Sequence, residues 1–205
     1  MPVSTHNPNY FGYCSKFFKR EIDEDGDKRL IPISFCIPKE KIVPAIPEKK
    51  YEFSYITPGG SDSSWPRDAR KTFIYEEETK YYQDYKESYF GLTCKKGGWD
   101  CMRHVEILAN GCVPIFTDLE WCPQRTLTFY PKSYLCMIKT IPGLKLVRIN
   151  NTEKPIYRGQ DIIQGASCLT DEFCFDSYLD YCGYLLEYTR KNLTTEALGK
   201  YIIEK

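Results

Sequence analysis

The stretch from residue 88 to residue 116, SYFGLTCKKGGWDCMRHVEILANGCVPIF, constrains the fold of this chain more than any other segment. Residues 88–94 have the character of a strand, and residues 95–99 form a glycine turn. Residues 101–110 carry apolar side chains at helical spacing. The wholly apolar run 112–116 is typical of a strand that is covered on both faces of a parallel sheet. The segment therefore predicts a buried β-α-β unit.

Both ends of the expected helix carry termination signals. Asp100 precedes the first apolar turn and is a candidate N-cap, because its side chain can accept a hydrogen bond from a free backbone N–H. Asn110 and Gly111 supply the C-terminal stop, since glycine readily adopts the left-handed conformation that ends helices. We expect the helix to start at the carboxyl edge of the sheet.

The rest of the chain continues the alternation of strands and helices. Further strands are predicted at residues 51–56, 71–76, 133–139 and 144–149. Further helices are predicted at residues 77–87, 177–191 and 195–203. This alternation predicts an α/β layered domain with a mostly parallel sheet. Residues 1–50 are rich in charge and proline and are interpreted as an irregular N-terminal leader that precedes the domain at residues 51–205.

Charge and hydropathy exclude several classes of partner. The 28 Lys and Arg residues balance the 28 Asp and Glu residues, so the bulk attraction needed for non-specific binding to nucleic acid or anionic membranes is missing. The sequence has no run of 18 apolar residues and no secretory signal near its start, so we expect no membrane insertion and a cytoplasmic location. Any anion site must be local.

Cysteine and histidine usage argues against metal and hydrolase chemistry. The ten cysteines include no CxxC pair, so we expect ordinary thiols and neither a zinc site nor any other metal site. His6 and His104 are the only histidines, which excludes an HExxH site. We expect His104 to be a packed structural residue rather than a catalytic base, because no acidic residue that would orient it is evident.

The turn and the helix start predict a phosphate site. Unpaired N–H groups and the positive end of the helix dipole stabilise an anion, Lys95 and Lys96 add cations, and Gly97 and Gly98 allow a ligand to approach the backbone. The alternative is that these residues form only a tight surface turn, and local physics does not separate the two.

Three side chains near the helix start have both a functional and a structural interpretation. Asp100 and Arg103, three positions apart, could both face the predicted phosphate site as substrate-binding residues, where Arg103 could bind a pyrophosphate bidentately. Alternatively, the two could form a surface pair. Glu106 could accept hydrogen bonds from a ribose diol or could simply face solvent. Trp99 could stack on a base or sugar ring or could anchor packing.

The string from Lys95 to Phe116, with Arg103, Glu106, Gly111, Cys112 and Pro114 in order, resembles the motif region of exostosin-like glycosyltransferases of the type encoded by large DNA viruses of algae and protists. The resemblance extends from about Leu30 to the C-terminus and covers most of the chain. It implies a Rossmann-like fold, namely one half of a GT-B enzyme that binds a nucleotide-diphosphate sugar and passes the sugar to a glycan or protein acceptor.

Carried over by position, the resemblance implies that Glu106 holds the ribose and that Arg103, with the turn at residues 95–98, holds the diphosphate. Retaining GT-B enzymes commonly have a second glutamate eight positions before the ribose-binding one, and Gly98 stands there in this chain. The resemblance therefore implies an inverting, metal-independent transferase that needs no cofactor beyond its nucleotide-sugar co-substrate.

Length departs from the family pattern, because only about fifty residues precede the donor-binding half where a complete acceptor domain is expected. Either the acceptor domain is missing, or a second chain supplies it, or the chain is a non-catalytic nucleotide-sugar-binding or interaction module. The catalytic residues stay unassigned, since the base of inverting members often lies in the acceptor domain. A manganese-dependent transferase is the third alternative, because residues 23–25 and 25–27 both spell DxD.

Overall fold

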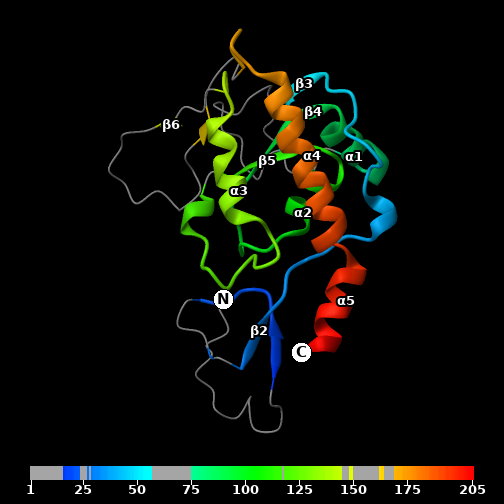
Figure 1. Ribbon diagram of the computed structural model, residues 1–205, viewed down its shortest axis with the longest axis vertical. Helices are drawn as coiled ribbons and strands as arrows, with labels where there is room; N and C mark the ends of the chain where they lie inside the picture. Colours follow the sequence, from blue (N-terminus) through cyan, green and yellow to red (C-terminus); the bar gives the residue numbers. More distant parts are fainter. Residues whose placement is uncertain are drawn as a thin grey trace.

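The computed structural model describes residues 16–23, 27, 29–56, 75–116, 118–144, 148–149, 162–163 and 169–205. Within these residues the chain is a mixed α/β protein whose helices pack around a short parallel sheet (Figure 1).

Three parallel strands form the central sheet in the order β3-β4-β5. They are β3 (Tyr51–Phe53), β4 (Ser88–Thr93) and β5 (Val113–Phe116). All four β5 residues are buried, which agrees with the wholly apolar run of this segment, and all but one of the six β4 residues are buried as well. The edge position of β5 accommodates Pro114, which cannot donate a ladder hydrogen bond.

Two helices connect these strands, α1 (Glu78–Lys86) before β4 and α2 (Met102–Ala109) before β5. Gly111 follows α2 with a φ of 62°, and its N–H donates to the Leu108 carbonyl while the Cys112 N–H donates to the Ile107 carbonyl. These two hydrogen bonds form a Schellman ending. The predicted β-α-β unit and its glycine stop are confirmed.

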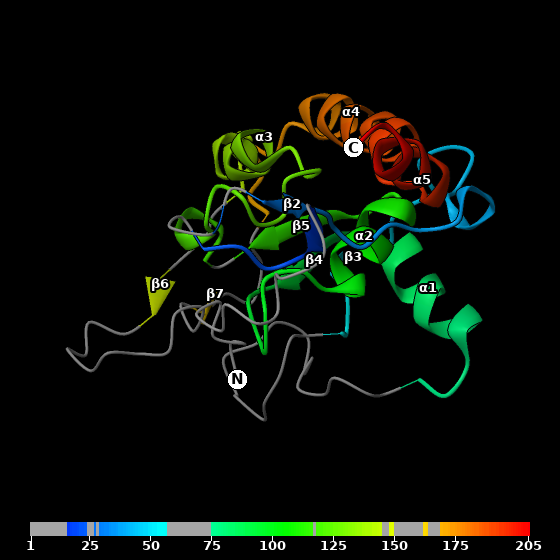
Figure 2. The ribbon, with the colours of Figure 1, turned by 90° about the horizontal axis from the view of Figure 1, so that it is seen from below.

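The helices cover both faces of the sheet (Figure 2). One face carries α3 (Lys132–Cys136) and α4 (Phe175–Asn192), and α5 (Thr195–Glu204) packs against α4. Tyr178 of α4 packs its ring on Phe90 of β4, in the larger core. On the opposite face, Tyr85 of α1 joins Ile107 and Cys112 in a smaller core.

The strand predicted at residues 133–139 is wrong, because this segment is helical. It comprises α3 and the 3-10 turn η5 (Met137–Thr140). Leu135 and Ile138, three positions apart, are buried, whereas Cys136 and Met137 between them are exposed. That spacing belongs to a helix and not to a strand, in which the buried positions alternate.

The strand predicted at residues 144–149 is confirmed only in part. Arg148–Ile149 forms β6, which pairs antiparallel with β7 (Ile162–Ile163), and Leu144 makes an isolated bridge to Leu169. Most of the strand predicted at residues 71–76 lies outside the described residues, and the two described positions are not in a strand.

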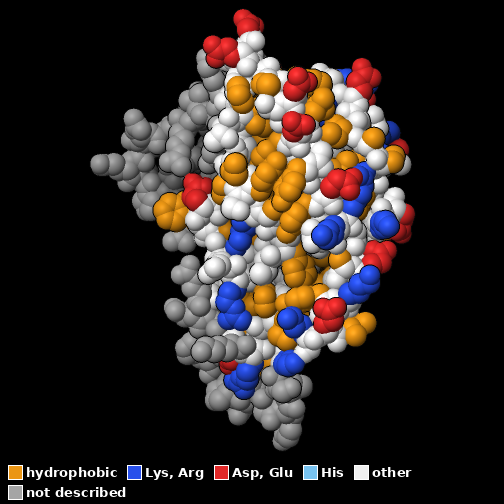
Figure 3. Space-filling model, in the orientation of Figure 1, with side chains coloured by type: hydrophobic (Ala, Val, Ile, Leu, Met, Phe, Trp, Pro, Cys, Tyr) orange, Lys and Arg blue, Asp and Glu red, His pale blue; other side chains and the backbone are white. Residues whose placement is uncertain are grey.

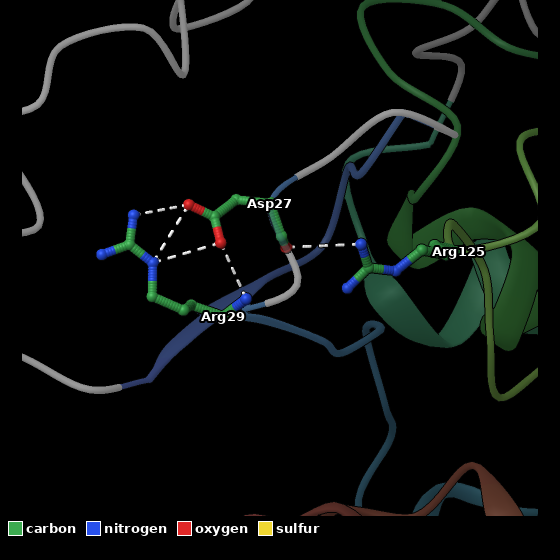
Figure 4. A network of polar contacts seen from close by, with 3 residues as sticks. All are labelled: Asp27, Arg29 and Arg125. Atoms are coloured by element: carbon green, nitrogen blue, oxygen red, sulfur yellow. Dashed lines mark hydrogen bonds and ion pairs between the residues drawn. The ribbon is translucent and has the colours of Figure 1, made fainter.

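The segment before residue 50 contains two short parallel strands, β1 (Phe17–Lys19) and β2 (Leu30–Pro32), and the 3-10 turn η2 (Lys39–Lys41). Arg125 donates to the Asp27 and Leu30 carbonyls, while Asp27 pairs with Arg29 (Figure 4). These contacts hold the β1-β2 ribbon against the loop that precedes α3.

Ile37, Ile42 and Val43 are buried in the larger core together with residues of α2, α4 and β5. The Val43 N–H donates to the Ala109 carbonyl at the end of α2. The predicted domain boundary at residue 50 stays a prediction, but residues on both sides of it share this core.

Hydrophobic side chains gather over α4 and toward α3 on one face of the molecule (Figure 3). Tyr134 stacks on Tyr181 and contacts Tyr184, whose side chain is 45% exposed.

Candidate functional site

The carboxyl ends of the parallel strands bring the predicted site residues to one edge of the sheet. Strand β4 ends at Thr93, the turn of residues 94–100 follows, and α2 begins at Met102. The edge where strands of a parallel sheet end and helices start is the usual position of an anion or nucleotide site.

A hydrogen-bonded chain fixes the first turn of α2. The Arg103 Nε–H donates to Thr93 Oγ1 at 3.2 Å, and Thr93 Oγ1 lies 2.9 Å from Nδ1 of His104. His104 Nε2 lies 2.8 Å from the Trp99 carbonyl, which can only accept, so Nε2 carries the proton and the Thr93 hydroxyl donates to Nδ1.

His104 is therefore a structural residue, as the sequence favoured. Its ring is fully buried and packs on Phe116. Burial, reinforced by the Arg103 charge, lowers the pKa of His104 to about 3, so the ring stays neutral at physiological pH. The hydrogen bond to the Trp99 carbonyl fixes the ring, and the one with the Thr93 hydroxyl orients Thr93 and, through it, Arg103.

Arg103 is held with an unused donor. Its side chain is 8% exposed, yet Nη2 is buried and has no hydrogen-bond partner within the described part of the chain. No described carboxylate, Asp100 included, forms an ion pair with it. A buried guanidinium that lacks an acceptor is costly, so this geometry fits a site for a ligand anion.

Lys96 supplies a second positive charge. Burial, followed by the repulsion from Arg103, lowers the pKa of its ammonium, which shows that the two cations are within electrostatic reach. Lys95 instead lays its ammonium over the Trp99 ring, 5.6 Å from the centroid. Trp99 itself is buried, which favours the packing interpretation of this side chain. Gly97 faces open space.

A carboxylate of the protein itself occupies part of the predicted phosphate cradle. Glu21 Oε1 accepts a hydrogen bond from the Asp100 N–H at 2.6 Å. The same oxygen lies only 2.8 Å from where a Cβ at Gly98 would stand, so a side chain at this position would displace the Glu21 carboxylate. Glu21 thus occupies the close approach that Gly98 was expected to offer to a ligand, while Gly97 faces open space.

Asp100 does not cap the helix. Cys101 is the N-cap residue, and the Asp100 carboxylate accepts hydrogen bonds from the Phe35 N–H at 2.9 and 3.2 Å. Burial raises the pKa of Asp100 to about 6. The predicted capping role is therefore wrong, because the Phe35 N–H, 65 positions away, offers this carboxylate a partner that no local pattern reveals.

Glu106 faces α1. Its Oε2 accepts from the Tyr81 hydroxyl at 2.8 Å and its Oε1 lies 3.4 Å from the Tyr82 hydroxyl. Burial, followed by the Glu106 charge, raises the pKa of both phenols, so they remain donors. A ribose would have to share or replace these hydrogen bonds, so the ribose role stays a prediction.

Sequence reasoning missed Asp118. It lies two residues beyond β5, it is 1% exposed, and its Oδ2 accepts from the Lys95 N–H at 3.0 Å. Its Oδ1 is buried without a partner among the described residues. An acidic residue just after a buried strand was the available signal, because that position falls on the same edge as Thr93.

Unsatisfied polar atoms concentrate around the start of α2. Besides Arg103 and Asp118, the buried hydroxyls of Ser34 and Tyr130 lack partners in the part of the chain that the structure describes. Ser34 precedes Phe35, which binds Asp100, and the Tyr130 ring contacts His104. Such groups are rare in native interiors. Four of the five among the described residues lie near the start of α2, and the fifth, Asn110 Oδ1, lies at its C-terminal end.

Metal and membrane signals are absent from the described residues. No group of three or more His, Cys, Asp or Glu side chains there could hold a metal ion. The eight cysteines in these ranges are free thiols. Both DxD triplets lie in part outside the described residues, because residues 24–26 are not described. None of the described helices combines the length and apolar composition needed to cross a membrane.

Comparison with known proteins yields no assignment. No protein-family model, no curated protein and no solved structure matches this chain.

Proposed function

We propose that this chain binds the diphosphate of a nucleotide sugar at the start of α2 and transfers the sugar to a glycan or protein acceptor, as an exostosin-like glycosyltransferase of GT-B type. The main observation in support is that Arg103 Nη2 is buried and has no hydrogen-bond partner among the described residues. A phosphate oxygen is the acceptor that best satisfies a preoriented guanidinium.

Three positive contributions converge on this position. Arg103 and Lys96 lie within electrostatic reach of each other, and α2 directs its positive dipole end toward the same edge. During transfer, negative charge develops on the departing nucleoside diphosphate, and preoriented cations would stabilise it. Under this proposal the reaction inverts the anomeric centre and uses no metal.

The first test is a calorimetric titration of the protein with uridine diphosphate and with guanosine diphosphate. We expect Arg103→Ala to weaken binding by about 1 to 3 kcal/mol, because a charge-assisted hydrogen bond is lost. Glu106→Ala should weaken binding by a similar amount if this carboxylate holds the ribose. Thermal unfolding should show that both variants remain folded.

Arg190→Ala is the matched control, because Arg190 binds the Val43 carbonyl near the opposite end of α2. It should leave nucleotide affinity unchanged. Equal affinity in wild type and Arg103→Ala would contradict the site. Binding of nucleotide sugars without release of nucleoside diphosphate would instead favour the non-catalytic binding module.

A further inference from the structure

Asp118 and Arg103 each form a hydrogen bond at the end of β4, Arg103 with Thr93 and Asp118 with the Lys95 N–H. β5 lies beside β4 in parallel register, with Thr93 opposite Phe116, so the residues following both strands emerge at the same edge. The Lys95 N–H, from the turn after β4, donates to Asp118 Oδ2. This hydrogen bond ties the carboxylate directly to the phosphate turn.

The same hydrogen bond occupies Oδ2 and leaves the other carboxylate oxygen unpaired among the described residues. Oδ1 is buried and has no partner within the described ranges. A carboxylate held by one oxygen and unsatisfied at the other is oriented to accept one more hydrogen bond. Asp118 Oδ1 is a hydrogen-bond acceptor without a partner, and Arg103 Nη2 is a hydrogen-bond donor without a partner among the same residues.

Cys94 shows that the two groups belong to one site. Burial raises the pKa of its thiol to about 11, and the next contributions come from Asp118, which raises it, and from Arg103 and Lys96, which lower it. The thiol therefore lies within electrostatic reach of the carboxylate and of both cations.

We propose that Asp118 is the general base that removes the proton from the acceptor hydroxyl. This assignment rests on the proposed transferase function. The hydroxyl proton passes to Asp118 Oδ1, and the freed oxygen lone pair forms a bond to the anomeric carbon. The bond from that carbon to the phosphate oxygen breaks, and its electron pair leaves with the nucleoside diphosphate beside Arg103 and Lys96.

The electrostatics of Asp118 support this role. Burial raises the pKa of the carboxyl to about 6, so it is ionised at pH 7.5 but is a stronger base than an exposed aspartate. The titratable groups around it are Lys95, Glu120 and the thiols of Cys94 and Cys122. Burial raises the pKa of both thiols to about 11, so neither titrates near pH 6.

The experiment compares Asp118→Asn and Asp118→Glu with Asp84→Asn. Asp84 is a matched control, because it is a buried aspartate whose carboxylate accepts the Tyr55 and Ile56 N–H groups beyond the end of β3. Release of nucleoside diphosphate from uridine and guanosine diphosphate hexoses is measured with water and with soluble glycosides as acceptors. Calorimetry gives the affinity of each protein for the free nucleoside diphosphates.

We expect Asp118→Asn to slow release about 100-fold or more while nucleoside diphosphate affinity stays within about twofold, as loss of a general base does. Asp118→Glu should keep part of the wild-type rate, and the control Asp84→Asn should keep the full wild-type rate. The wild-type rate should fall as pH drops through about 6, since the base becomes protonated. The pH at which the rate falls should differ between Asp118→Glu and the wild type.

Other outcomes separate the two proposals. Wild-type rates in a folded Asp118→Asn would overturn the base and leave the transferase function intact. If Asp118→Asn does not fold, an unaltered rate and pH profile in Asp118→Glu would overturn the base as well. Binding without any release by the wild type would overturn the transferase function, and the base assignment with it.

Discussion

The roles of single residues around α2 depend on which partner the fold brings to them. Arg103 and Asp100 lie three positions apart, yet Arg103 binds Thr93 while Asp100 binds Phe35, so the surface pair that sequence spacing allows does not form. Glu21, 79 positions before Asp100, provides the carboxylate at the turn instead. Charge at the site is therefore assembled from distant segments.

Glu21 competes with a diphosphate for the phosphate turn. We expect Glu21→Gln to bind uridine diphosphate about threefold to tenfold more tightly than wild type, because the amide keeps an acceptor for the Asp100 N–H but removes the repulsive charge. Calorimetry at fixed ionic strength measures the change. Glu196→Gln removes the same charge from an exposed position of α5 and should have no effect. Weaker binding in Glu21→Gln would contradict this competition.

At the scale of elements, the sequence predicted the β4-α2-β5 unit correctly. Its signals are local, because the apolar spacing of the helix, the helix stop and the apolar run of the next strand lie within a few residues of one another. Residues 133–139 show the opposite case. Their short apolar run contains Leu135, Cys136, Met137 and Ile138, which fits either a strand or a helix by composition. Packing of Leu135 and Ile138 into the core decides for a helix.

The end of α2 offers a test at this scale. We expect Gly111→Ala to lower the free energy of unfolding by about 2 kcal/mol, because alanine disfavours a positive φ and its Cβ would meet Pro47 at 2.8 Å. Denaturant unfolding measures the change. Gly199→Ala, in the open interior of α5, should instead stabilise the protein by about 0.5 to 1 kcal/mol. An unchanged midpoint for Gly111→Ala would show that the turn relaxes freely.

At the scale of the whole molecule, the segment before residue 50 completes the core. Ile37 forms a parallel bridge with Thr194 between α4 and α5, and Lys49 donates to the Lys86 and Gly111 carbonyls at the ends of α1 and α2. A cation at two helix C-termini is stabilising. Residues 51–205 therefore have neighbours that a boundary at residue 50 would remove.

Deleting residues 1–50 tests whether the predicted domain folds alone. Exposing the sites filled by Ile37, Ile42 and Val43 should cost about 5 to 9 kcal/mol, at about 1.5 to 3 kcal/mol for each buried side chain, which is comparable to the whole stability of a typical domain. We expect residues 51–205 to lack a cooperative thermal transition by circular dichroism. A sharp transition near that of the full chain would support the predicted boundary.

The sequence alone determined the parallel β-α-β unit, the glycine turn, the Gly111 stop and the position of Arg103 at the start of α2. These features depend on periodicity and on backbone preferences of neighbouring residues. Only the tertiary structure decided that Glu106 faces Tyr81, that Glu21 fills part of the turn and that Asp118 joins the edge. The physical reason is that side-chain partners come from segments 23 to 79 positions apart, whose meeting depends on how the core packs.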